Sequence, residues 1–125
     1  MLFNNAGIAG KVATMWDLTA ADAKKLYDVN FFSHFTTINE FVPAMVQRGR
    51  GHIVANCSIT GFLYGPKGTC YVSCKHAMTA AMDCLKEDLR VEGVGDKVKV
   101  TTVYPSVTET NIFDGGLNIQ PRYGS

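Results

Sequence analysis

A tyrosine and a lysine lie four residues apart, at Tyr71 and Lys75, in a stretch with helical periodicity. Side chains four positions apart share one face of a helix, so the phenol and the ammonium group can interact. A tyrosine with its ordinary pKa of about 10 is a poor proton acceptor at neutral pH. A neighbouring ammonium group favours the phenolate and lowers that pKa. The pair could therefore exchange a proton with an alcohol or a ketone.

Ser58 precedes this tyrosine by 13 residues and is joined to it by a glycine-rich segment. It ends an apolar run of strand length, and ligands of open α/β sheets bind where the strands end. The Ser58 hydroxyl could hydrogen-bond the same substrate oxygen as Tyr71 and stabilise its developing charge. Asn30, in the preceding helical region, could link the site to solvent through a water molecule.

Two further polar segments follow predicted strands. Asn4-Asn5-Ala6-Gly7 comes after the short apolar stretch Leu2-Phe3, and Pro105 comes after the β-branched run from Lys97 to Tyr104. Parallel strands end at one edge of their sheet. These residues are therefore expected to converge with Ser58 and Tyr71.

The elements that must position these groups can be predicted from periodicity. Thr19 and Asp22 have the spacing of a capping box, and a helix is expected from about Ala20 to Arg48, with a break near Asp28 or a bend at Pro43. A strand is expected over His52–Ser58, a loop over Ile59–Thr69, and a second helix over about Tyr71–Val91, where small residues allow close packing.

Strands that alternate with long helices predict an α/β fold with a partial doubly wound parallel sheet, the C-terminal portion of a Rossmann-like fold. We expect a single partial domain over residues 1–125, with residues 114–125 as a loop or disordered tail. The chain is 46% hydrophobic and 18% charged, with a formal net charge of +1. This composition fits a globular unit and excludes a nucleic-acid binder that relies on excess basic charge.

The four cysteines are expected to be reduced thiols in a reducing compartment. Cys70, Cys74 and His76 lie close in sequence, but structural zinc usually needs tight Cys-x2-Cys pairs and four ligands, so no metal site is predicted. His34 and His76 are expected to be packing or surface residues. No apolar run is long enough for a transmembrane helix.

In combination, these motifs resemble the short-chain dehydrogenase/reductase family, in their order and in their spacing. The resemblance rests on Asn4-Asn5-Ala6-Gly7, Asn30, Ser58, Tyr71-x3-Lys75 and the segment from Pro105 to Thr110. Within the family, residues 99–113 resemble the branch of retinol and 17-beta-hydroxysteroid dehydrogenases. Ser106 replaces a glycine that many family members have after the proline, and that branch often lacks it.

The resemblance implies a catalytic tetrad of Asn30, Ser58, Tyr71 and Lys75. It also implies that NAD or NADP binds along Asn4, Ala6 and Gly7 at the adenosine part, that Tyr71 and Lys75 contact the cofactor, and that Pro105 and Thr110 hold the nicotinamide end. The reaction implied is interconversion of an alcohol with a ketone or aldehyde, and the branch implies a lipophilic, retinoid-like or steroid-like substrate. The sequence does not indicate whether NAD or NADP binds, because the glycine-rich dinucleotide fingerprint is not among these residues.

The resemblance further implies a homodimer formed through the two long helices. For the intact protein it implies a location on the cytoplasmic side, on endoplasmic reticulum or lipid droplets, with membrane association only through an upstream segment. By family standards the chain starts within a strand. One alternative is therefore an inactive truncated chain that acts, if at all, by pairing its dimer helices with an intact subunit. Another is a partial sequence record without independent existence.

Overall fold

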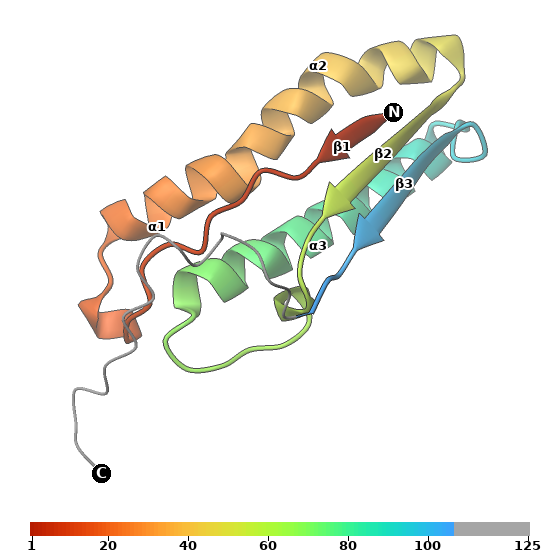
Figure 1. Cartoon of the computed structure of the whole chain (residues 1–125). Helices are drawn as coiled ribbons and strands as arrows, with labels where there is room; N and C mark the ends of the chain where they lie inside the picture. Colours follow the sequence, from red (N-terminus) through yellow and green to blue (C-terminus); the bar gives the residue numbers. More distant parts are fainter. Residues whose placement is uncertain (107–125) are drawn as a thin grey trace.

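Three parallel strands form one sheet, which makes up one layer of the molecule (Figure 1). The computed structural model describes residues 1–106, and the strands are β1 (Leu2–Asn4), β2 (Gly51–Asn56) and β3 (Val98–Val103), in the order β1-β2-β3. Both pairings are parallel. The α/β class and the parallel sheet predicted from the sequence are confirmed.

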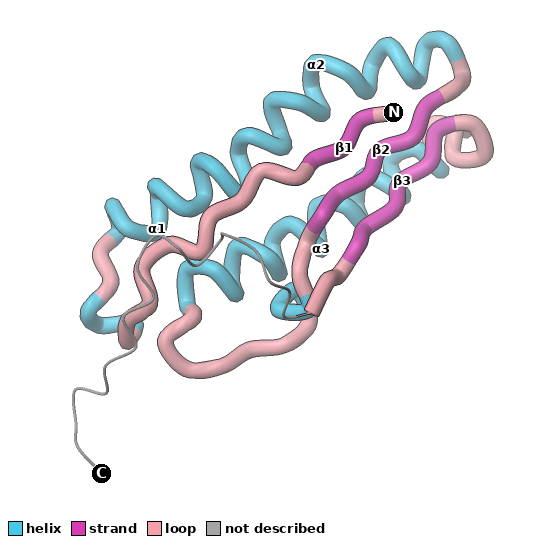
Figure 2. Tube along the Cα trace, in the orientation of Figure 1, coloured by secondary structure: helices cyan, strands magenta, loops and turns pink. Residues whose placement is uncertain are grey.

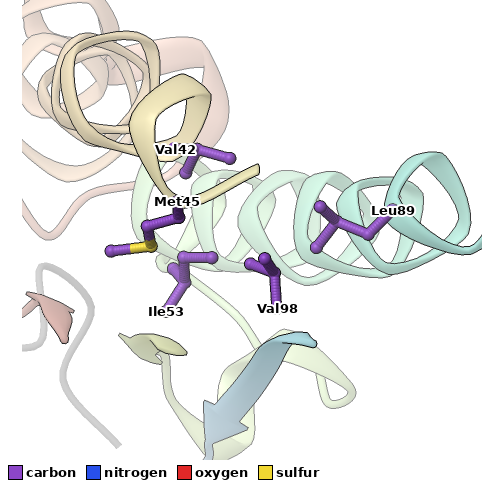
Figure 3. Packing of buried hydrophobic residues seen from close by; sticks show 5 residues of the cluster. All are labelled: Val42, Met45, Ile53, Leu89 and Val98. Atoms are coloured by element: carbon purple, nitrogen blue, oxygen red, sulfur yellow. The ribbon is translucent and has the colours of Figure 1, made fainter. Parts of the chain in front are cut away.

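The two long helices pack on the same face of this sheet. Right-handed crossovers that step twice in one direction place their helices on one side. Figure 3 shows the resulting core, in which side chains from both helices meet the buried side chains of β2 and β3; its members are Val42, Met45, Ile53, Leu89 and Val98. Burial alternates along β2 accordingly. Ile53 and Ala55 are fully buried, whereas Val54 between them is only partly buried and faces the other side.

The first long helix is continuous but contains one wider turn. It runs through α1 (Ala20–Tyr27), the π-helical segment η2 (Asp28–Phe32) and α2 (Ser33–Arg48). Its predicted capping box is present, with Asp22 N–H donating to Thr19 Oγ1 over 3.1 Å and Thr19 N–H donating to Asp22 Oδ2 over 2.9 Å. The break expected near Asp28 is therefore a π turn, which inserts one extra residue and changes the direction in which later side chains point.

The remaining elements agree with the sequence to within about two residues. Helix α3 (Thr69–Val91) starts two residues earlier than expected, and the expected loop before it contains a short 3₁₀ turn, η3 (Ile59–Gly61). Another 3₁₀ turn, η1 (Met15–Asp17), precedes α1. In the part of the chain that the structure describes, no helix has the length and hydropathy needed to cross a bilayer.

Because α2 packs closely on β2, we expect that a side chain added at Gly51 will destabilise the fold. A β-carbon on this residue would lie 2.5 Å from Met45 Sδ and 2.7 Å from Met45 Cβ. We expect Gly51→Ala to lower the free energy of unfolding by about 1 to 3 kcal/mol, as overpacked cores do. Urea unfolding measures this. Gly65→Ala is the matched control, because a β-carbon there meets nothing within 4 Å. Equal urea midpoints for the two variants would contradict the packing described.

Candidate active site

The candidate site lies at the edge of the sheet where all three strands end, and Figure 2 shows the loops that leave the strands there. Ser58 is held in this edge by both of its neighbours. Cys57 N–H donates to Val103 O over 2.8 Å, and Ile59 N–H donates to Pro105 O over 3.0 Å. Thr60 N–H donates to Ser58 Oγ over 3.2 Å, so the hydroxyl hydrogen remains available to another acceptor.

The first turns of α3 bring Tyr71 and Lys75 to the same place. The Ser58 hydroxyl lies close enough to the Tyr71 phenol to oppose the rise of its pKa, and Lys75 Nζ lies over the Tyr71 ring, 5.4 Å from its centroid. The predicted convergence of Ser58, Tyr71 and Lys75 is therefore observed. These side chains converge because the end of β2 and the start of α3 pack together through η3.

The expected effect of the lysine on the tyrosine is absent from this structure. Burial raises the pKa of Tyr71, and the Ser58 hydroxyl opposes that shift without reversing it. The ammonium group faces the ring, and it does not offset the cost of burying the phenolate. The sequence-based prediction that Lys75 lowers the pKa of Tyr71 is therefore wrong.

Lys75 is a buried residue, with only 4% of its surface exposed. Burial lowers its pKa. Among residues 1–106 no carboxylate forms an ion pair with it. A β-carbon placed on Gly7 would lie 3.8 Å from Lys75 Nζ and 3.7 Å from Asn30 Oδ1, so the ammonium group faces a neutral loop. Burial also raises the pKa of the Cys74 thiol to about 11, which leaves no thiolate there at neutral pH.

Asn30 lies in the π-helical segment and is fully buried. Its Nδ2 donates to Ile8 O over 2.7 Å, and its Oδ1 accepts from Ile8 N–H over 2.7 Å. The oxygen and the nitrogen of the Asn30 amide therefore both bind the main chain of Ile8, in the way that the main chain of a neighbouring strand would. The π turn directs Asn30 inward, toward the loop that follows β1.

Two further residues of α2 hold the same loop, and the sequence did not indicate them as site residues. Thr37 Oγ1 lies 2.7 Å from Asn4 Oδ1, and His34 Nε2 lies 3.1 Å from Ala6 O. Asn4 and His34 are both buried. His34, expected to be a packing or surface residue, thus has a specific polar partner. The signal in the sequence that could have indicated this role is that His34 lies one helical turn after Asn30.

The His34 ring donates from Nε2, because a carbonyl oxygen can only accept. Burial lowers the pKa of His34, the hydrogen bond to Ala6 opposes this shift, and the charge of Lys75 adds to it. Protonation would place an N–H at Nδ1, which is buried without a partner. The loop that carries Ala6 is therefore held by the neutral form of His34.

Pro105 lies at the site edge, as its pairing with Ile59 shows. Thr110, the other residue expected near the nicotinamide end, lies outside the described residues. So does the tail expected over residues 114–125.

A pH dependence of stability follows from His34. The unfolded chain takes up a proton at His34 as the pH falls through its ordinary pKa of 6.5, whereas the folded chain resists protonation to lower pH. Stability is therefore full above about pH 6.5 and falls as the pH drops below it. We expect the free energy of unfolding to decrease between pH 7.5 and pH 5, and His34→Gln, which keeps a donor for Ala6, to reduce that decrease. Urea unfolding at both pH values measures it; an unchanged decrease in the variant would contradict this account.

Comparisons with known proteins give the same assignment as the geometry. Residues 1–116 match the family described as short chain dehydrogenase. The chain is 32% identical over 126 residues to Dehydrogenase/reductase SDR family member 7B of Rattus norvegicus, covering 100% of this chain and 37% of that protein.

Two solved structures extend the likeness to the fold. A short chain dehydrogenase/reductase from Burkholderia phymatum in complex with NAD has a TM-score of 0.83 and 30% identity, and the match covers 97% of this chain and 42% of that one. ElxO with NADP bound has a TM-score of 0.76 and 25% identity, with 85% and 41% covered. The chain thus spans less than half the length of these relatives. Because the family match covers residues 1–116, the chain belongs to the short-chain dehydrogenase/reductase family.

Proposed function

We propose that the protein carrying this chain is an NAD(P)-dependent oxidoreductase that interconverts an alcohol with a ketone or aldehyde. One observation carries the proposal: the Ser58 hydroxyl, the Tyr71 phenol and the ammonium group of buried Lys75, which no carboxylate of residues 1–106 pairs, meet at one edge of the sheet. Family membership supports it, as do the NAD and NADP bound in the two similar structures.

The cofactor fits this edge because no carboxylate among residues 1–106 pairs with the Lys75 ammonium group. Buried charges are normally paired, and sugar hydroxyl groups would supply the missing acceptors. Lys75 and Tyr71 would contact the nicotinamide ribose, Asn4, Ala6 and Gly7 the adenosine part, and Pro105 with Thr110 the nicotinamide end. When bound, the cofactor supplies the hydride acceptor or donor. Both NAD and NADP are compatible with these contacts.

Ser58 and Tyr71 handle the substrate oxygen. The Ser58 hydroxyl stabilises negative charge on that oxygen by donating its hydrogen. The Tyr71 phenol gives its proton to the oxygen during reduction and takes one from it during oxidation. For the second role the phenolate must be accessible, although burial raises the Tyr71 pKa.

Lys75 and Asn30 support this proton transfer. Lys75 would orient bound ribose hydroxyl groups beside the Tyr71 phenol. The Asn30 side chain is engaged with Ile8 at both of its polar atoms. The water link to solvent proposed for Asn30 would therefore run from its main chain.

Apolar residues beside Ser58 support a lipophilic substrate of the retinoid or steroid kind. Ile59, Phe62 and Leu63 are exposed in the segment that follows Ser58. Phe62 packs on Tyr104 with ring centroids 4.3 Å apart, which places an aromatic surface next to Pro105. Exposed apolar clusters of this kind mark ligand or partner sites. The resemblance to the retinol and hydroxysteroid branch supports the same class and a location on endoplasmic reticulum or lipid droplets for the intact protein.

The catalytic proposal predicts a defined loss at Tyr71. Removing one oxygen in Tyr71→Phe deletes the proton donor and should lower kcat at least about 100-fold, the usual contribution of general acid–base catalysis. The assay follows nicotinamide absorbance with a panel of retinoid, steroid and short-chain alcohols. Tyr27→Phe is the control, because the Tyr27 hydroxyl bonds Ser73 rather than the site. A Tyr71→Phe protein with unchanged activity, or a wild-type protein that binds neither cofactor, would refute the proposal.

Exposed aromatic side chains along the first long helix support the proposed homodimer. Phe32, at the end of η2, and Phe35 and Phe41, in α2, are each about half exposed. An inactive chain that paired with an intact subunit would use the same side chains. We expect Phe35→Asp to raise the dimer dissociation constant at least about tenfold, because it buries a charge at the contact. Analytical ultracentrifugation measures this constant. The proposal is overturned by a monomeric wild-type protein, or by a variant that dimerises as tightly as the wild type.

A further inference from the structure

The main-chain carbonyl oxygen of Lys75 is surrounded by buried side-chain donors. Thr79 Oγ1 donates to it over 2.9 Å, and Cys57 Sγ lies 3.4 Å from it. Cys57 Sγ also lies 3.4 Å from Thr79 Oγ1. Cys57 and Thr79 are both buried, so these three groups bind one another rather than water.

Gly61 closes this cluster from the η3 turn. A β-carbon on Gly61 would lie 2.5 Å from Thr79 Oγ1 and 3.4 Å from both Cys57 Sγ and Lys75 O. Only a residue without a side chain allows η3 to approach α3 this closely. The end of β2, the η3 turn and the second turn of α3 are therefore joined at a single point.

The residues joined there are neighbours of the proposed catalytic groups. Cys57 directly precedes Ser58 in the chain. Lys75 itself provides the carbonyl group, and Tyr71 lies one helical turn before it. The cluster thus connects the element that carries the hydroxyl with the element that carries the phenol and the ammonium group.

We infer that Cys57, Gly61 and Thr79 are positioning residues that fix the spacing of Ser58 from Tyr71 and Lys75. This inference rests on the proposed function, because it assigns the three residues to the geometry of that site. None of the three acts on a substrate. The thiol and the hydroxyl serve as hydrogen-bond donors, and the hydroxyl hydrogen goes to Lys75 O while the thiol hydrogen goes to Lys75 O or Thr79 Oγ1.

A positioning role and a packing role predict different results for Thr79. Thr79→Val keeps the shape of the side chain and removes its donor, whereas Thr79→Ser keeps the donor and removes a methyl group. If the hydrogen bond matters, the serine variant retains activity and the valine variant loses it. If packing matters, the order is reversed. Thr36→Val is the matched control, because exposed Thr36 makes the same kind of bond to Phe32 O, over 3.2 Å.

The experiment measures kcat and KM for these variants in the protein that carries this chain. We expect Thr79→Val to lower kcat about tenfold, because small misplacements of reacting groups slow the chemical step. KM for the cofactor should stay within about twofold, because the cluster does not contact the ligand. Thr79→Ser and Thr36→Val should stay within about twofold of the wild type in both constants. Unchanged kcat in Thr79→Val would overturn the inference.

A second readout is independent of activity. The rate of iodoacetamide alkylation at Cys57, followed by peptide mass spectrometry, reports on the cluster directly, and opening it should speed alkylation about tenfold in Thr79→Val alone. If the wild-type protein oxidises no alcohol, the proposed function fails, and this comparison decides whether the cluster holds the two elements together. Equal alkylation rates in all variants would overturn it. If Thr79→Val does not fold, Cys57→Ser, which keeps a donor, and Cys57→Ala, which lacks one, give the same kinetic comparison.

Discussion

A buried lysine whose ammonium group has no counter-charge among residues 1–106 is the constraint on which the rest of this structure depends. Lys75 is 4% exposed, and no carboxylate of residues 1–106 pairs with it. Burying an unpaired charge costs free energy, so the fold must contribute that energy elsewhere. Proteins keep such an arrangement where a ligand completes it, which connects the cost at Lys75 to the cofactor contacts proposed for it.

The surroundings of Lys75 are held by polar contacts from one continuous helix. The π turn directs Asn30 to Ile8, and the following turns direct His34 to Ala6 and Thr37 to Asn4. These contacts fix the end of β1 and the loop after it, which faces the ammonium group. The contacts of Cys57 and Thr79 join the end of β2 to the helix that carries Lys75. Neither set of contacts supplies a negative charge to Lys75.

Much of this arrangement could be predicted from the sequence, because its signals are local. The capping box at Thr19 and Asp22, and the β-branched run that became β3, depend on neighbouring residues only. The convergence of Ser58 and Tyr71 followed from the rule that parallel strands end at one edge. These features needed no knowledge of side-chain packing.

The features that were missed depend on contacts between distant segments. The role of His34 requires knowing that α2 passes the Ala6 carbonyl group, 28 positions away in the chain. The raised pKa of Tyr71 requires knowing how deeply the phenol is buried and that Lys75 faces its ring. The break near Asp28 was expected, but its π geometry was not, because periodicity alone does not distinguish a π turn from a kink.

The central claim is that Lys75 is left unpaired in order to bind a cofactor. The most direct test is the urea unfolding of wild-type and Lys75→Met protein, each with and without saturating NADH or NADPH. Exposed Lys86→Met serves as the control. Without cofactor, Lys75→Met should be more stable than the wild type by about 1 to 4 kcal/mol, because it removes an uncompensated buried charge. With cofactor at about 100 times its dissociation constant, the wild type should gain about 2.7 kcal/mol and the variant almost nothing. A variant that is less stable without cofactor, or that gains as much from it as the wild type, would contradict the account.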